Sequence, residues 1–222
     1  MKALVYTAEH TTEYRDEPDP VCEDGEVLIQ VEAVGICGSD MHAWHGHDPR
    51  RVPPLILGHE ACGIVVGGPT TGTRVVVNPL ITCGECAFCQ SGRANLCATR
   101  ELIGMRLPGA FAEHVVLPAR NLIEVPDGME PVVAALTEPC ATAWHALTLA
   151  LRALWRPLAE CRALVIGGGS VGLLGALILK AWGARDIRLA ETNQLRLETA
   201  IAAGVDAFDP RATPAEEDAY EL

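Results

Sequence analysis

The sequence predicts an α/β protein made of a mostly-β N-terminal region, followed by the first half of a doubly wound parallel sheet. Two observations carry this prediction. Short runs of β-branched and apolar residues, separated by Gly and Pro, occupy residues 27–125. After residue 160 the pattern changes to strand, glycine turn, helix, strand, helix and strand, which is the order of a parallel βαβαβ unit.

The N-terminal region is expected to form a many-stranded, partly open barrel. Its strands are predicted at residues 27–31, 63–66, 73–77, 111–117 and 122–125. Residues 131–154 are rich in Ala and Leu at helical spacing and predict a helical stretch. Residues 157–161 resemble a linker. We therefore expect one domain at 1–155 and a second at 156–222.

The second domain is predicted to begin with three parallel strands. The strands are expected at Arg162–Ile166, Asp186–Ala190 and Ala207–Asp209, with helices at Val171–Trp182 and Gln194–Ala203. A complete sheet of this kind has strand order 3-2-1-4-5-6, and only strands 1 to 3 are visible here. We therefore expect a C-terminally truncated domain, with an unpaired edge on strand 1 where strand 4 would bind.

Composition narrows the possible functions. The formal net charge is −12 and the pI is near 5.0, which argues against nucleic-acid binding because phosphates require clustered Lys and Arg. The N-terminus has no apolar signal core, and the longest apolar run, residues 163–182, is interrupted by glycines and Lys180. We expect a cytoplasmic protein. In that compartment nine cysteines indicate metal binding or catalysis rather than disulfide bonds.

Four cysteines form one dense cluster with the spacing C-x2-C-x2-C-x7-C. The residues are Cys83, Cys86, Cys89 and Cys97. Four thiolates in one loop match a closed tetrahedral zinc site, which is structural because no coordination position is left open. Unliganded cysteines, an iron–sulfur cluster and a DNA-binding zinc ribbon are the alternatives, and the acidic charge disfavours the last.

A second metal site is suggested by two separate motifs. The segment G-I-C-G-S-D-M-H at 35–42 follows a predicted strand, and G-H-E at 58–60 precedes another. A catalytic zinc needs about three protein ligands and one open position. Cys37 and His59 are the first candidates, although a lone cysteine or histidine is more often a structural residue.

The glycine turn after the first parallel strand predicts a dinucleotide site. Residues 167–172 read G-G-G-S-V-G, a G-x-G-x-x-G motif between a strand and a helix. Gly167 permits the tight turn, Gly169 lets a pyrophosphate approach, and Gly172 permits close packing of helix and strand; Ser170 and Val171 complete the motif. Glu191 ends the second strand, where a carboxylate accepts ribose hydroxyls and favours NAD over NADP.

These motifs, in this order, resemble the zinc-dependent medium-chain alcohol/polyol dehydrogenases, and the sorbitol/threonine dehydrogenase branch in particular. The resemblance covers essentially the whole chain. It implies a GroES-like catalytic domain followed by a Rossmann domain. It also implies two zinc ions per chain, one catalytic and one structural, with NAD as the cofactor.

The resemblance also implies roles for individual residues. Cys37 and His59 would bind the catalytic zinc, with the adjacent Glu60 as an exchangeable ligand or near-ligand. Asp40 would orient a zinc ligand through a hydrogen bond. Ser39 would accept the proton of the bound alcohol and His42 would pass it to solvent. Arg196 matches a family position near the adenosine, although it can also be a simple exposed cation.

The third zinc ligand is left open between two residues. Glu138, in the sequence Thr-Glu-Pro-Cys, matches the carboxylate of the polyol branch and is the preferred candidate. Cys140 lies two residues later, in the region where classical alcohol dehydrogenases use a cysteine. Met41, Trp44 and His45 are expected near the substrate pocket.

The predicted function is hydride transfer between an alcohol or polyol and NAD. The expected partner is a small-molecule substrate, with neither nucleic acid nor membrane, and a homo-oligomer is left open. Because one wall of the nicotinamide crevice is missing, we expect little activity from these 222 residues alone. The alternative is an inactive zinc-binding remnant that binds a partner through its open sheet edge.

Overall fold

The computed structural model describes residues 1–68, 70–215 and 219–222. The chain forms two compact units, Met1–Glu138 and Pro139–Leu222. The second unit thus begins within the helical segment at 131–154, all of which the sequence analysis assigned to the first domain.

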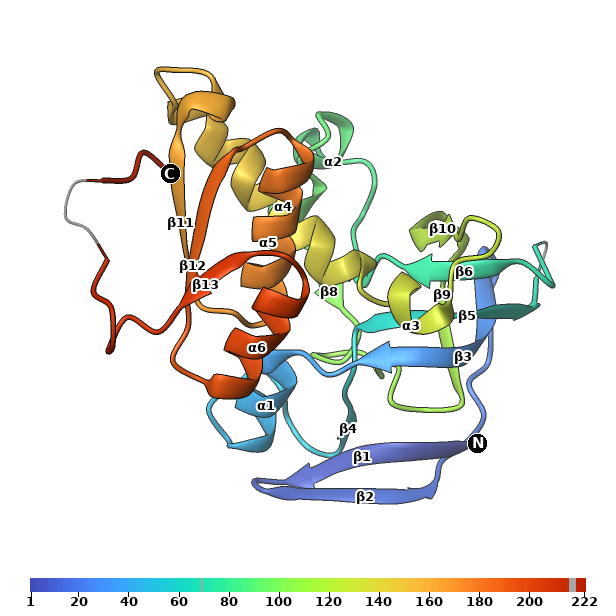
Figure 1. The fold of residues 1–222 in the computed structure, drawn as a ribbon. Coiled ribbons are helices and arrows are strands. Elements are labelled where there is room, and N and C mark those ends of the chain that lie inside the picture. Colours follow the sequence, from blue (N-terminus) through green and yellow to red (C-terminus); the bar gives the residue numbers. More distant parts are fainter. Residues whose placement is uncertain (69, 216–218) are drawn as a thin grey trace. The chain divides into compact units, whose positions relative to one another are not determined.

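The first unit is built on a five-stranded antiparallel sheet (Figure 1). Its strand order is β10 (Leu122–Glu124), β6 (Arg74–Val77), β5 (Glu60–Gly67), β3 (Glu26–Gly35) and β9 (His114–Pro118). The pairing of β3 with β5 shifts register twice, near Leu28 and near Ala33, and such irregularities bend a strand and increase its twist. The sheet curls as a result, which confirms the predicted partly open barrel.

Alternating apolar residues explain this curled sheet. Val27 and Ile29 of β3, Val65 of β5 and Leu117 of β9 are each at most 1% exposed and form one core cluster. Their side chains point to the same inner face because strand residues two apart share a face. Burying four side chains of this size stabilises the fold by roughly 1.5–3 kcal/mol each.

Smaller elements complete the first unit. The hairpin of β1 (Lys2–Ala8) and β2 (Thr11–Asp16) pairs with β4 (Leu55–Ile56), and the short strands β7 (Leu80–Ile81) and β8 (Glu101–Leu102) pair with each other. The short helices are α1 (Gly38–Trp44), α2 (Ala87–Gln90), η1 (Ala94–Leu96), η2 (Ala119–Asn121) and α3 (Pro131–Ala134). Helix α1 begins just after β3 ends, which places the Cys37 motif at the end of this strand.

The helical stretch predicted over residues 131–154 is interrupted. Helix α4 (Thr137–Ala150) follows α3 after a turn and continues into the 3-10 turn η3 (Leu151–Ala153). Pro139 lies in the first turn of α4, where a missing N–H costs no helical hydrogen bond. A second 3-10 turn, η4 (Leu158–Glu160), leads to the next strand.

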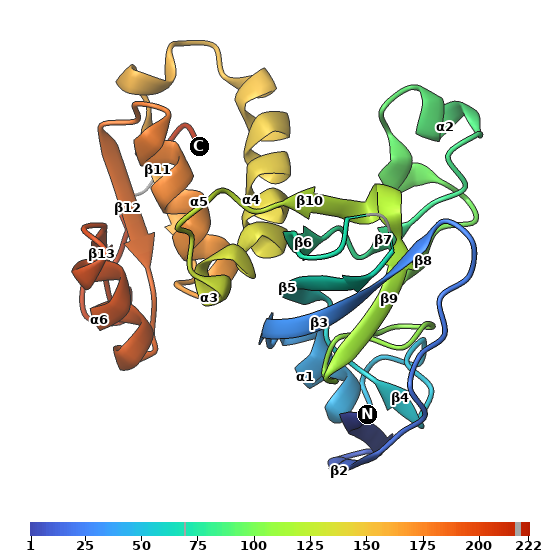
Figure 2. The same cartoon turned by 90° about the vertical axis from the view of Figure 1, so that its right-hand side faces the viewer.

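The second unit contains the predicted three-stranded parallel sheet (Figure 2). Strand β12 (Asp186–Ala190) lies between β11 (Arg162–Ile166) and β13 (Asp206–Phe208), and helices α5 (Ser170–Ala181) and α6 (Gln194–Ala202) connect them. Ala176 of α5 and Ala200 of α6 form a buried cluster with Leu189 of β12. This arrangement confirms the first half of a doubly wound sheet.

The outer edge of β11 corrects one expectation. We predicted an unpaired edge, but the last two residues lie along it. The N–H of Leu164 donates to the carbonyl of Leu222 at 2.8 Å, and the N–H of Glu221 donates to the carbonyl of Arg162 at 3.0 Å. An apolar strand edge with free N–H and C=O groups is a template for further pairing, and these two residues satisfy part of it.

No helix in the described part of the chain combines the length and the apolar character that crossing a bilayer requires.

Candidate functional site

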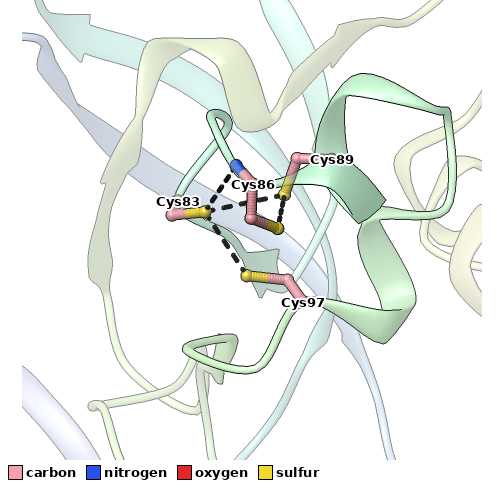
Figure 3. A group of neighbouring side chains, drawn as sticks. All are labelled: Cys83, Cys86, Cys89 and Cys97. Atoms are coloured by element: carbon pink, nitrogen blue, oxygen red, sulfur yellow. Dashed lines mark hydrogen bonds between the residues drawn. The ribbon is translucent and has the colours of Figure 1, made fainter.

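The four clustered cysteines converge in a small lobe beside the sheet (Figure 3). Sulfur–sulfur distances are 3.5 Å for Cys86–Cys89, 3.7 Å for Cys83–Cys97 and 3.9 Å for Cys83–Cys89. Zinc–sulfur bonds of about 2.3 Å place tetrahedral sulfurs about 3.8 Å apart. The spacing suits one central ion and leaves no room for a multi-iron cluster between the sulfurs.

Two of the four thiols are shifted toward the thiolate, the form in which cysteine binds metal. Cys86 is shifted the other way: a backbone hydrogen bond from Cys89 lowers its pKa, but burial and the side chains of Cys89 and Cys83 outweigh it and raise that pKa to about 11. Backbone N–H groups of Glu85 and Cys86 hold the pKa of the Cys83 thiol below its usual range. The Cys83 backbone and the Thr99 hydroxyl lower the pKa of Cys97 to about 6. At neutral pH the cluster therefore carries negative charge that a dication would neutralise.

Strand pairing brings the second candidate metal site together. Gly35 at the end of β3 is paired with Glu60 at the start of β5, so Cys37 and His59 lie just beyond the paired ends. One ligand atom of each of Cys37, His59 and Glu60 lies within 4.8 Å of the others. His59 and Glu60 are buried and Cys37 is half-buried. The two motifs that were distant in sequence thus meet at one point.

Asp40 contacts the imidazole ring of His59. Its Oδ1 lies 3.4 Å from His59 Nδ1, and its Oδ2 accepts a 3.0 Å hydrogen bond from the N–H of Cys37. Oδ1 and Nδ1 are both buried without a well-aligned hydrogen-bond partner. The Asp40 contact leaves the other ring nitrogen, Nε2, to face the ligand group, as in metal sites where a carboxylate orients a histidine.

The electrostatics of this group suit a cation. Burial by itself lowers the pKa of His59, but the side chains of Asp40 and Cys37 outweigh it and raise that pKa to about 10. Surroundings that attract a proton this strongly attract a metal ion by the same charge. These residues therefore fit a zinc ion with cysteine, histidine and carboxylate ligands.

Glu138 belongs to the same unit and lies within electrostatic range of this group. Burial raises its pKa; His59 lowers that pKa, while Glu60 and Asp40 raise it. Its oxygens are not among the ligand atoms that converge on Cys37, His59 and Glu60. Cys140 belongs to the second unit.

The position of His59 is fixed by backbone contacts on its N-terminal side. Gly58 packs directly against Gly104, where an added Cβ would lie 2.9 Å from the Gly58 carbonyl oxygen. The N–H of Ala110 donates to that same oxygen at 2.9 Å. A Cβ on Gly109 would also collide with the Leu57 and Gly58 carbonyls. Only glycine fits where these two segments cross.

Ser39 and His42 both come from α1 but have different surroundings. Ser39 Oγ lies 3.5 Å from His59 Nε2 and accepts a 3.1 Å hydrogen bond from Arg51 Nη2. His42 is exposed, with its ring centre 6.3 Å from that of His47. Among the described residues, no hydrogen bond joins His42 to Ser39. Arg51 was missed in the sequence analysis, because nothing in the Pro-Arg-Arg-Val segment indicates which arginine is buried.

An apolar cavity of about 200 Å³ lies beside α1. Met41 and Trp44, two of the residues expected near a pocket, line it together with Tyr6, Leu57 and Phe111. His45 does not line it; its ring lies against those of His10 and Trp44.

The glycine turn has the geometry of a phosphate-binding turn. Gly167 has a φ of +97°, a conformation that side chains disfavour. Gly169 is the N-cap of α5, whose first residues are Ser170 and Val171. Gly172 lies against the Gly167 carbonyl, so a side chain there would force the helix away from the turn. The free N–H groups at this helix start suit an anion.

Glu191 is buried and already engaged. Its Oε2 accepts from the N–H of Gly168, and its Oε1 accepts from the N–H groups of Thr192 and Asn193, each at 2.7 Å. The backbone donors of Asn193 and Gly168 hold its pKa below the usual range, and Arg196 contributes to the same effect. Arg196 itself is exposed on the first turn of α6. The carboxylate therefore ties the glycine turn to the end of β12.

Comparison with known proteins agrees with this geometry. The alcohol dehydrogenase GroES-like domain family matches residues 23–127. L-galactonate-5-dehydrogenase of Escherichia coli K12 is 36% identical over 219 residues, which cover 96% of this chain and 62% of that protein. The chain thus spans about three fifths of the length of this relative.

Solved structures of dehydrogenases have the same fold as this chain. One described as a zinc-binding dehydrogenase from Sinorhizobium meliloti 1021, bound to NADP, has a TM-score of 0.85 and 34% identity; the match covers 96% of this chain and 63% of that one. An alcohol dehydrogenase from Escherichia coli CFT073, complexed with NADH, has a TM-score of 0.86 and 29% identity, with 96% and 64% coverage. Fold, motif order and relatives agree: residues 23–127 match the alcohol dehydrogenase GroES-like domain family, and the chain as a whole is similar to zinc-type dehydrogenases.

Proposed function

We propose that a protein containing this chain is a zinc-dependent oxidoreductase that transfers hydride between an alcohol or polyol and NAD. The observation that carries the proposal is the convergence of Cys37, His59 and Glu60, with Asp40 behind the histidine. Because the chain spans about three fifths of its relatives, the activity is proposed for the longer protein.

The catalytic metal would be held by Cys37, His59 and a carboxylate. An oxygen of Glu60 already lies among the converging ligand atoms. Glu138 is close enough for the charges of His59 and Glu60 to shift its pKa. We assign Glu138 the role of third ligand in the loaded protein and Glu60 that of an exchangeable neighbour. When bound, zinc supplies Lewis-acid polarisation of the substrate oxygen.

The chain's own residues would manage the proton. Ser39 lies beside the ligand nitrogen of His59, within reach of an oxygen bound at that site. It would accept the proton of the substrate alcohol there while passing its own hydroxyl proton on toward solvent. His42 is exposed on the same helix and would release the proton to solvent. Asp40 would hold His59 in the tautomer that keeps Nε2 free for the metal.

The cofactor proposed is NAD, bound through the Gly167–Gly172 turn and Glu191. The nicotinamide ring supplies the hydride acceptor. The turn offers backbone N–H groups to the pyrophosphate, while Glu191 places negative charge where NADP would carry its 2′-phosphate. Arg196 would lie near the adenosine. One solved relative holds NADP and another NADH, so the Glu191 carboxylate is the feature on which this choice depends.

The four-cysteine lobe would hold a second, structural zinc. Its sulfur spacing and its two acidified thiols support this assignment. Two zinc ions per chain are therefore expected. The substrate would be a small alcohol, polyol or sugar acid, in line with the galactonate named for one relative.

Metal analysis tests the proposal directly. Purified protein should contain two zinc ions, Cys37→Ser should contain one, and Cys22→Ser should contain two. Cys22 is an exposed cysteine outside both clusters and is the matched control. A Cys37→Ser protein that keeps both ions would refute the catalytic site, and hydride transfer to NAD by the longer protein would distinguish an enzyme from an inactive zinc-binding remnant.

A further inference from the structure

Arg51 is a buried cation with every side of its guanidinium engaged. Its side chain is 1% exposed. Nε donates to the Gly104 carbonyl at 2.8 Å, Nη1 to Asp48 at 2.6 Å and Nη2 to Ser39 Oγ at 3.1 Å. Burying a charge is costly unless it is paired and fully hydrogen-bonded, so this arrangement fixes the arginine in one geometry.

Asp48 alone does not explain why Arg51 is buried. The neighbouring Arg50, whose side chain is 61% exposed, already binds both oxygens of Asp48 at 2.8 Å and 3.0 Å. Two guanidinium groups thus share one carboxylate. Arg50, Arg51 and Asp48 together therefore carry a net charge of about +1, and Arg51 Nη2 points toward Ser39 Oγ.

The contact restricts what the Ser39 hydroxyl can do. A hydroxyl oxygen has two acceptor sites and one proton to donate. Arg51 occupies one acceptor site and, being charged, polarises the O–H bond toward donation. Ser39 Oγ lies 3.5 Å from His59 Nε2 and therefore borders the Cys37–His59–Glu60 group.

We propose that Arg51 is a positioning residue that holds Ser39 as a hydrogen-bond donor toward the anionic oxygen of an alcohol bound at this metal site. Arg51 touches neither metal nor substrate and acts through Ser39. It also joins Ser39 to the Gly104 segment that packs beside His59, so hydroxyl and ligand are set by the same contact network. The inference rests on the proposed function, because it requires a metal at Cys37 and His59.

The test compares Arg51→Met, Arg51→Lys and the matched control Arg50→Met. Arg50 binds the same Asp48 but is exposed and makes no contact with Ser39 among the described residues. Each protein is loaded with cobalt(II), and its affinity for trifluoroethanol is read from the visible cobalt bands. Zinc-loaded crystals of parent and variants give the position of Ser39 Oγ, and thermal unfolding measures stability.

We expect Arg51→Met to bind trifluoroethanol about 10- to 150-fold more weakly, the range for losing one charge-assisted hydrogen bond. Ser39 should rotate away from the non-protein ligand of zinc. Arg51→Lys keeps a charge for Asp48 and should regain stability. Its donors all sit on one nitrogen, whereas three separate nitrogens of Arg51 reach Gly104, Asp48 and Ser39, so affinity should stay low. Arg50→Met should match the parent in affinity.

Two outcomes would overturn the inference while leaving the proposed function intact. One is a metal-loaded Arg51→Met protein that binds trifluoroethanol with parental affinity. If Arg51→Met does not fold, parental affinity of Arg51→Lys counts in the same way. The other is a Ser39 that keeps its orientation without the arginine. A parent protein with no metal at Cys37 and His59 would instead overturn the proposed function, and the inference with it.

Discussion

Removing metal from the four-cysteine lobe should unfold the lobe and leave the five-stranded sheet intact. The lobe has almost no core of its own. Between Cys83 and Cys97 only Cys97 is buried, and the regular structure is limited to one turn of α2 and one of η1. Packing therefore contributes little to holding these residues in place.

The magnitudes indicate that the metal, rather than packing, keeps the chain of the lobe ordered. Ordering about fifteen residues costs roughly 15–30 kcal/mol at about 1–2 kcal/mol of backbone entropy each. In zinc-finger peptides a structural zinc contributes about 10–16 kcal/mol at pH 7, a value that already includes the cost of ordering the chain. The lobe is thus ordered with the ion and loses nearly all of its stabilisation without it. The Val27–Leu117 core, in contrast, contains no cysteine ligand and should survive.

Hydrogen exchange read by mass spectrometry measures this difference. In the metal-free protein, or in Cys86→Ser, the amides of Gln90, Ser91 and Arg93 should lose their protection, because their acceptors lie within the lobe. Amides of β3 and β5 should exchange as before. Cys22→Ser is the control for loss of an exposed thiol. Unchanged protection of the lobe after complete zinc removal would refute the reasoning.

Three further predictions follow from single side chains. Glu138→Ala should release the catalytic metal more readily than Cys140→Ala, as measured by zinc retained during dialysis against a chelator; the reverse order would assign the ligand to the cysteine. Asp48 has its pKa lowered to about 2, chiefly by Arg50. The pKa of Asp48 is lower in the folded than in the unfolded protein. Its ionised carboxylate therefore contributes about 2 kcal/mol at most to the free energy of unfolding, a contribution that is present above pH 4 and disappears as the pH falls toward 2. Urea unfolding at several pH values should therefore show the stability gap between parent and Asp48→Asn closing in acid, and a constant gap would contradict this. Glu191→Ala should weaken NAD binding and reduce discrimination against NADP in titrations of the longer protein, whereas an unchanged preference would remove Glu191 from that role.

Local patterns were enough to predict most of the fold. Alternating apolar residues placed β3, β5 and β6 within a few residues of their bounds, and the strand–glycine–helix order placed β11, α5 and β12. These signals survive because they reflect short-range geometry and the burial of one face. The candidate metal ligands could be proposed from the sequence because each lies in a compact motif of unusual residue types.

Long-range contacts between ordinary residues were not predictable in the same way. The sequence marks two arginines after Asp48 but not that one is buried against Ser39. It identifies the Glu191 carboxylate but not the three backbone donors that already engage it. Likewise, nothing in Glu221 and Leu222 indicates that they lie along the edge of β11. Each case depends on which residues meet in space, and a single sequence contains no record of that.

The crossing of Gly58 with Gly104 and Gly109 bears on which mutations the metal site can tolerate. Side chains can turn to another rotamer when a neighbour grows, but backbone atoms in contact have no such freedom. A methyl group added at Gly104 would therefore push the Gly58 backbone aside and displace the strand that begins beside His59. In a comprehensive mutational survey, the sensitive positions of this centre should extend to a loop more than forty residues away in the chain, at residues that touch no ligand atom.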